Sequence, residues 1–160
     1  MDSVVKPQIR ARNEGEAIWF LGAITFIKAS AETTGGAFGL IEQVIPAGFA
    51  SPYHVHHNED EAFYVVEGGV TFVSDGKATR VGAGAFVFGP REIPHGFRIE
   101  GTSPSRLLIL ATPAGFEGFV REAGDPAKDL VTPPPGPPDL ERLGQLAAKH
   151  SIDLLGPLPL

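Results

Sequence analysis

The chain has 160 residues, of which 42% are hydrophobic, so it can bury one core but is too short for two ordinary domains. Its 13 Lys and Arg against 19 Asp and Glu give a formal net charge of -6. No basic run is dense enough to follow a phosphate backbone, and we expect no nucleic-acid partner. Cysteine is absent, which excludes disulfides, thiolate ligands and a cysteine nucleophile.

The N-terminal segment MDSVVKPQIR lacks the apolar region of a signal peptide. The longest apolar stretch, Ile18 to Ile27, is about half of the ~20 residues that a membrane-spanning helix needs. We therefore expect a cytoplasmic protein without a membrane partner.

Short strands and frequent turns are indicated by 20 glycines and 15 prolines spread along a chain rich in Val, Ile and Phe. Turn signals such as Gly68-Gly69 and Asp75-Gly76 separate the strands, which favours a barrel or sandwich over βαβ units. The predicted strands are Ala17–Ile27, Phe38–Ile45, Ser51–His56, Ala62–Glu67, Val70–Ser74, Ala85–Phe88, Gly96–Glu100 and Arg106–Thr112.

Beyond Thr112 the pattern becomes helical, so we expect a barrel with a flanking helix over residues 1–125. Residues 126–160 are predicted to form a Pro-rich connector, stiff at 133–138, and a helical tail in which Asp139 can cap the helix start. The tail ends in the apolar sequence LLGPLPL, which is unfavourable if exposed. We expect a homodimer to cover it, although packing on its own barrel would also do so.

Two histidines and a glutamate form a candidate ligand group. His54 and His56 are two apart on a predicted strand, and alternation of side chains directs both imidazoles to one face. Glu61 has an odd spacing from His56, so we expect a reversal at 57–60 and an antiparallel return strand that brings Glu61 beside the histidines.

A third imidazole comes from His95, which follows Gly89-Pro90 and Pro94, where a tight turn can direct the side chain into the barrel. Three imidazoles and one carboxylate suit one divalent transition-metal ion, with positions left for water, substrate or dioxygen. Iron, nickel, manganese, cobalt, copper and zinc all fit this ligand set.

The same stretch resembles the two motifs of the cupin superfamily. The first motif reads Gly48, five residues, His54-Val55-His56, four residues, Glu61, six residues, Gly68, with the family spacing throughout. The second reads Gly84, five residues, Pro90-Arg91-Glu92, two residues, His95, three residues, Ile99. Glu92 and Ile99 replace the Gly and Asn of the family pattern, and no ligand is lost.

The resemblance implies an all-β double-stranded β-helix, or jelly-roll, cupin barrel with short C-terminal helices. In texture the chain is similar to small single-barrel cupins of the quercetin-dioxygenase-like type. That resemblance implies a metal-dependent dioxygenase acting on a flavonol or similar aromatic enol, with Glu61 as the base. A redox-neutral cyclase, isomerase or lyase, or a non-catalytic small-molecule-binding module, would use the same site.

Residues around the ligands suggest a small apolar or aromatic substrate, with dioxygen as co-substrate if the protein is a dioxygenase. If Glu61 and His95 face inward, alternation turns a set of neighbours inward as well. Side chains that simply fill the barrel interior would show the same alternation. We expect His57 to face away from the site, and Glu59 and Asp60 to cap an exposed turn. The candidate pocket residues are Tyr53, Phe63, Val65, Phe97 and Ile99.

Overall fold

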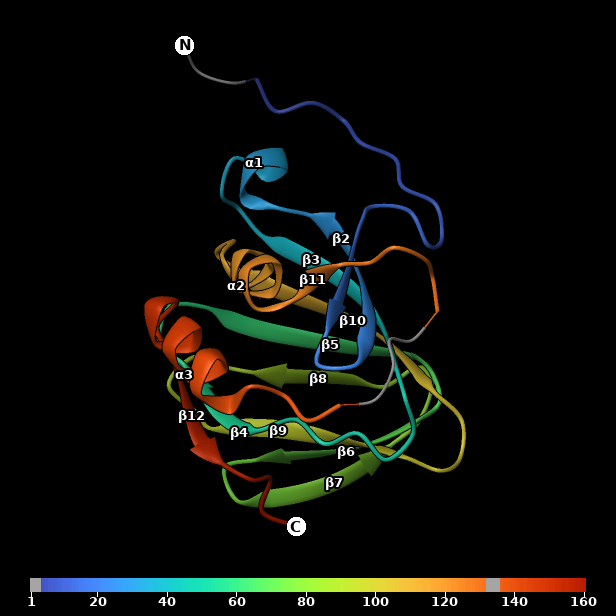
Figure 1. Ribbon diagram of the computed structural model, residues 1–160, viewed down its shortest axis with the longest axis vertical. Helices are drawn as coiled ribbons and strands as arrows, with labels where there is room; N and C mark the ends of the chain where they lie inside the picture. The colour runs from blue at the N-terminus through green and yellow to red at the C-terminus, as the bar shows by residue number, and fades with distance from the viewer. Residues whose placement is uncertain (1–3, 132–135) are drawn as a thin grey trace.

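The computed structural model describes residues 4–131 and 136–160 and consists mainly of strands (Figure 1). The strands are β1 (Glu16–Phe20), β2 (Ala23–Ala29), β3 (Gly39–Ile45), β4 (Tyr53–His56), β5 (Asp60–Glu67), β6 (Gly69–Ser74), β7 (Lys77–Val81), β8 (Phe86–Gly89), β9 (His95–Glu100), β10 (Ser105–Thr112), β11 (Asp125–Pro126) and β12 (Ile152–Gly156). The helices are α1 (Ala31–Thr34), α2 (Phe116–Ala123) and α3 (Leu140–Lys149). Within the described ranges no helix is long and apolar enough to cross a membrane.

Two antiparallel sheets form the barrel. The seven-stranded sheet has the order β11-β1-β2-β3-β10-β5-β8, and the five-stranded sheet has the order β12-β4-β9-β6-β7. Consecutive strands such as β4 and β5 belong to different sheets, so the chain crosses repeatedly between the two layers. The predicted all-β jelly-roll barrel with short C-terminal helices is confirmed.

The core lies between the sheets and follows from strand alternation. In β3 every second residue is buried, and Ile41 and Ile45 are each 1% exposed. Leu107 and Ile109 on β10 and Phe63 on β5 join them in one cluster, which continues into the five-stranded sheet. A period of two thus gives each strand one face toward the barrel interior.

Two of the strand predictions for the barrel are wrong for local reasons, one by merging two strands and one by omitting a strand. The stretch predicted as a single strand over 17–27 is a hairpin, because Leu21 and Gly22 both take left-handed φ values, 50° and 81°, as a two-residue hairpin turn requires. Strand β7 was not predicted, because its residues Lys77–Val81 are mostly exposed and lack an alternating apolar pattern.

The C-terminal region contains strands as well as the predicted helices. Helix α3 begins where the Asp139 side chain accepts a hydrogen bond from the Arg142 backbone N–H, 3.0 Å away. Strand β12 then pairs with β4, with Ile152 opposite His56. This part of the tail therefore lies on its own barrel, beside the helices (Figure 1). Residues 133–135 of the predicted stiff stretch 133–138 lie outside the described residues.

The pairing of β12 predicts that this strand contributes to stability. Ile152 is 2% exposed and belongs to the core cluster, so Ile152→Ala should lower the free energy of unfolding by about 2–5 kcal/mol. Leu155 on the same strand is 51% exposed, and Leu155→Ala should change the free energy of unfolding by no more than about 0.5 kcal/mol. Urea unfolding of both variants measures the difference, and equal midpoints would show that β12 contributes nothing.

Candidate metal centre

Three histidines and one glutamate converge inside the barrel. His54 and His56 lie on β4, Glu61 on β5, and His95 is the first residue of β9. One ligand atom from each of the four lies within 4.8 Å of the others. Within the five-stranded sheet His54 pairs with His95, which places their rings 4.7 Å apart. Glu61 reaches the three imidazoles from the facing sheet.

The route by which Glu61 enters the site differs from the predicted one. We expected β5 to return antiparallel to β4, but β4 pairs with β9 and β12, whereas β5 pairs with β10 and β8. The chain between His56 and Asp60 crosses from one sheet to the other. This crossing turns the inward face of β5 toward β4, so the odd spacing of Glu61 still delivers its carboxylate to the histidines.

Hydrogen bonds fix the orientation of all three imidazoles. The Nδ1 atoms of His54, His56 and His95 lie 2.7, 2.9 and 3.2 Å from the Pro52 carbonyl, the Glu59 carboxylate and the Ile93 carbonyl, respectively. Because these partners only accept hydrogen bonds, each Nδ1 carries the proton and each Nε2 is directed toward Glu61. This arrangement is the one that metal-ligating histidines adopt.

The contacts with Glu61 leave one buried nitrogen without a hydrogen bond. Oε2 of Glu61 lies 2.6 Å from Nε2 of His95 and 4.0 Å from Nε2 of His54. Nε2 of His56 is 3.1 Å from the same oxygen, but its alignment is poor and it has no hydrogen-bond partner among the described residues. A buried, unpartnered ring nitrogen beside a carboxylate fits a site built for a cation.

The electrostatics of the site also favour the binding of a cation. Burial favours the neutral acid of Glu61, but His56 and His95 hold the pKa of its carboxyl well below the usual range. Burial also opposes a charge on His56, yet Glu61 and the hydrogen bond to Glu59 raise the pKa of its imidazole to about 10. Burial lowers the pKa of His54 to about 4. Glu61 therefore stabilises one positive charge here, which a divalent ion could supply in place of a proton.

Glu59 is a residue of the site that sequence reasoning missed. We predicted that it caps an exposed turn, whereas it is 4% exposed and lies 2.9 Å from Nδ1 of His56. A carboxylate there orients the ring and increases its basicity. The only signal in the sequence was an acidic residue three positions after a candidate ligand. Asp60 does lie at the surface, where it pairs with Arg91.

His57 and Glu92 lie outside the ligand group. The ring of His57 is directed away from His56, with its two nitrogens 2.9 Å from Glu92 and 2.8 Å from Asp153. Glu92 replaces the Gly of the second motif and has φ 70°, a conformation that Gly adopts more easily. The turn before His95 thus keeps a left-handed residue despite the substitution.

A cavity of about 60 Å³ adjoins the ligands. Of the candidate pocket residues, Phe63 and Phe97 line it. Val65 and Ile99 are buried in the core cluster and do not line the cavity, and half-buried Tyr53 does not line it either. Sequence reasoning missed several lining residues, because they belong to elements that are distant from the ligands along the chain. These residues are Phe20, Gln43, Phe116, Leu143 and Ile152.

The geometry predicts different effects for two adjacent histidines. His56→Ala removes one of three imidazoles and should sharply reduce bound metal, because an incomplete ligand set loses a bond and its fixed geometry. His57→Ala removes only surface ion pairs and should leave the metal content unchanged. Elemental analysis after identical dialysis measures both, and equal metal loss would contradict this assignment.

A second comparison concerns the glutamates that contact these histidines. Glu59→Gln should weaken metal binding about 10–100-fold, because the hydrogen bond to His56 loses its charge. Glu92→Gln makes the same change beside the exposed His57 and serves as the matched control. Titration against a chelator of known affinity gives both dissociation constants, and indistinguishable values would rule out a role of Glu59 in metal binding.

Comparison with known proteins finds similarity to cupins over part of the chain. Residues 41–111 match the family described as Cupin domain. The chain is 27% identical over 127 residues to quercetin 2,3-dioxygenase of Bacillus subtilis, covering 79% of this chain and 37% of that protein. An uncharacterised protein of Methanocaldococcus jannaschii is 27% identical over 74 residues, 46% of this chain and 59% of that protein. The chain therefore spans less than two thirds of the length of either relative.

Solved structures share the barrel. A predicted oxalate decarboxylase from Thermotoga maritima superposes with a TM-score of 0.61 at 18% identity, covering 66% of this chain and 99% of that one. The polyketide cyclase RemF from Streptomyces resistomycificus superposes with a TM-score of 0.57 at 24% identity, covering 67% of this chain and 80% of that one. At these identities the likeness shows the fold alone. The chain is thus similar to cupins in its match over residues 41–111, in its jelly-roll barrel and in the ligand pattern of both motifs.

Proposed function

We propose that this chain is a cupin and a metal-dependent dioxygenase that acts on a flavonol or a similar aromatic enol. The observation that carries the proposal is the similarity to a quercetin 2,3-dioxygenase over 127 residues, a stretch long enough to hold both ligand motifs. The grouping of three imidazoles and one carboxylate beside an aromatic cavity supports it. Bound there, a divalent ion would supply the Lewis acidity that makes an enol hydroxyl more acidic.

Glu61 is the proton acceptor in this proposal. Its lowered pKa keeps the carboxylate ionised, as a base requires, but also makes it a weak base. It can therefore take a proton only from a group that is itself acidified, such as an enol hydroxyl at the metal. Glu61 is 2% exposed, so bulk water has little access to compete for this proton.

Aromatic side chains around the ligands favour an apolar substrate. The ring of Phe116 lies 5.3 Å from that of His56, and the ring of Phe63 lies 5.8 Å from that of His95. These rings exclude water and offer edges and faces to a flat molecule. Lys and Arg are absent from the described cavity lining, which disfavours phosphates and di-acids.

The cavity volume limits which members of this class can enter. Ligand sites usually enclose roughly 300–1,000 Å³, well above the 60 Å³ here. A flavonol would require movement of half-buried lining side chains such as Leu21, Phe49 and Leu154, whereas smaller enols need less. The substrate panel should therefore run from small enols to flavonols.

Glu61→Gln tests the proposal because it keeps the shape and one ligand oxygen but removes charge and basicity. Oxygen uptake should fall ~10²–10⁴-fold, much more than metal content falls. Glu67→Gln is the control, since Glu67 is exposed on the same strand. Each protein is loaded with iron, nickel, manganese or cobalt and assayed with the enol panel.

Oxygen consumption also separates the alternatives. Wild-type protein that consumes no oxygen with any metal or substrate would refute the dioxygenase proposal. Turnover of the same substrates without oxygen would then favour a redox-neutral cyclase, isomerase or lyase. Binding without turnover would favour a small-molecule-binding module.

A further inference from the structure

The outer face of the seven-stranded sheet carries two rows of neighbouring side chains across β3, β10, β5 and β8. In one row Leu40 pairs with Leu110. Leu110 pairs with Ala62 on β5, which in turn pairs with Phe88 on β8. In the other row Leu108 pairs with Tyr64, which in turn pairs with Phe86. We call the following six residues the outer patch: Leu40, Tyr64, Phe86, Phe88, Leu108 and Leu110.

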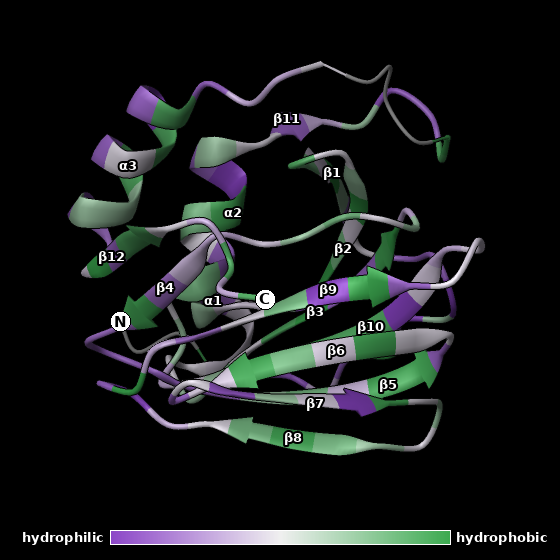
Figure 2. Cartoon of the chain, turned by 90° about the horizontal axis from the view of Figure 1, so that it is seen from below, coloured by the Kyte–Doolittle hydropathy of each residue, from purple (hydrophilic) through white to green (hydrophobic). Residues whose placement is uncertain are grey.

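Several side chains of the outer patch are exposed to an unusual degree. Tyr64 is 46% exposed, Phe86 67% and Phe88 53%, and they adjoin one another on two paired strands. Strand β8 is the edge of its sheet, and Figure 2 shows it as a largely hydrophobic strand away from helices α2 and α3. Single exposed apolar residues are common on protein surfaces. A contiguous group of exposed aromatic side chains on an edge strand is instead typical of a surface that contacts another molecule.

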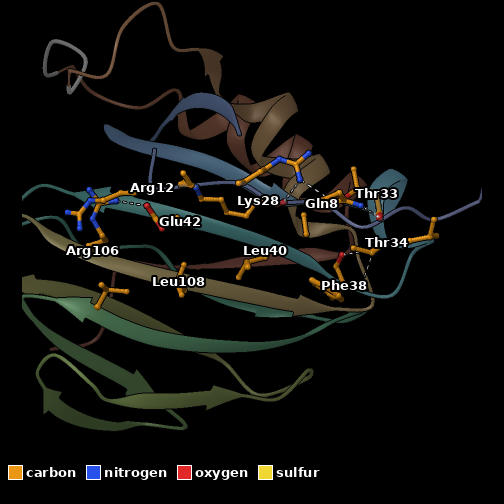
Figure 3. A pocket seen from close by; sticks show the side chains of 15 residues that line it. Gln8, Arg12, Lys28, Thr33, Thr34, Phe38, Leu40, Glu42, Arg106 and Leu108 are labelled. Carbon is orange, nitrogen blue, oxygen red and sulfur yellow. Dashed lines mark hydrogen bonds and ion pairs between the residues drawn. The ribbon is translucent and has the colours of Figure 1, made fainter. Parts of the chain in front are cut away.

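The apolar surface continues into a groove of about 740 Å³ between the N-terminal segment and the same sheet face. Leu40 and Leu108 lie on its floor, and Gln8 and Arg12 lie on the N-terminal side (Figure 3). Lys28 holds this segment in place by donating to the carbonyls of Ala11 and Glu14. The outer patch is thus the exposed part of a larger face.

The outer patch contains no charged side chain, and two ion pairs beside it are formed within the chain. Arg106 pairs with Glu42 beside Leu108, and Arg12 pairs with Glu67 at the end of β5. A highly charged partner would have to break these pairs. The outer patch of a second copy is likewise uncharged and bordered by its own ion pairs, so two outer patches can meet without strong repulsion between like charges.

The size of the face suits a dimer. At about 4.8 Å between strands and about 3.3 Å per residue, four strands of this length present roughly 400–500 Å². The groove and the N-terminal segment, where Val5 is 54% exposed, extend this area toward the ~800 Å² per partner of a stable interface. The C-terminal tail is less suitable, because its Leu154 packs against the chain's own core.

We propose that the outer patch binds the same patch of a second copy of this chain across a twofold axis, forming a homodimer. An isologous interface needs a surface that is self-complementary, and an uncharged apolar patch bordered by internal ion pairs meets that requirement. The barrel interior is left free, because the patch side chains point away from the ligands on the opposite face of the sheet.

Solution mass tests this proposal independently of any catalytic activity. Light scattering after size exclusion should give the wild-type chain twice the 16.9 kDa of one copy. The double variant Phe86→Glu, Phe88→Glu should give 16.9 kDa, because it would bury four unpaired charges in the dimer. Leu140→Glu is the control: Leu140 is 62% exposed but lies on α3, so the dimer should persist.

A milder variant covers the case in which two charges on β8 prevent folding. Phe86→Ala, Phe88→Ala should weaken dimerisation at least tenfold in sedimentation equilibrium, with thermal unfolding of the monomer reported alongside. A wild-type mass of one chain throughout the micromolar range would overturn the proposal. So would a dimer that persists in the folded glutamate variant, or one that only Leu140→Glu disrupts.

Discussion

A carboxylate buried among three imidazoles is the constraint on which the centre of this barrel depends. Removing an ionised group from water costs several kcal/mol unless partners compensate, and Glu61 is only 2% exposed. Its partners His54 and His56 lie on one strand of the facing sheet and His95 on the next. The two layers must therefore approach at this point with the correct register, since a shift of one residue would turn the histidines to the outside.

The C-terminal elements complete this centre. Strand β12 pairs with β4, the strand that carries two of the ligands, and Phe116 of α2 packs edge-on against His56. Phe116, Leu143 of α3 and Ile152 of β12 line the cavity. Segments more than 50 residues beyond the first ligands thus keep water away from the site, which strengthens every electrostatic interaction within it.

The seven-stranded sheet serves two purposes through its alternating side chains. On β5, Glu61 and Phe63 face the candidate metal centre, whereas Tyr64 faces outward into the proposed dimer interface. Because the two faces share one backbone, a dimer would hold β5, the strand that carries Glu61, in place without contacting the ligands. A covered outer face would also bury the exposed aromatic side chains of β5 and β8.

The sequence by itself determined the barrel class and which four residues are the candidate ligands, because strand alternation and motif spacing are local properties. It did not determine β7, whose exposed residues lack alternation, or the hairpin at Leu21-Gly22. Only the tertiary structure decided that Glu61 arrives from the opposite sheet, that Glu59 turns inward to His56, and that β12 joins β4. Each of these depends on contacts between distant segments, and the spacing of residues along the chain does not encode which strands become neighbours.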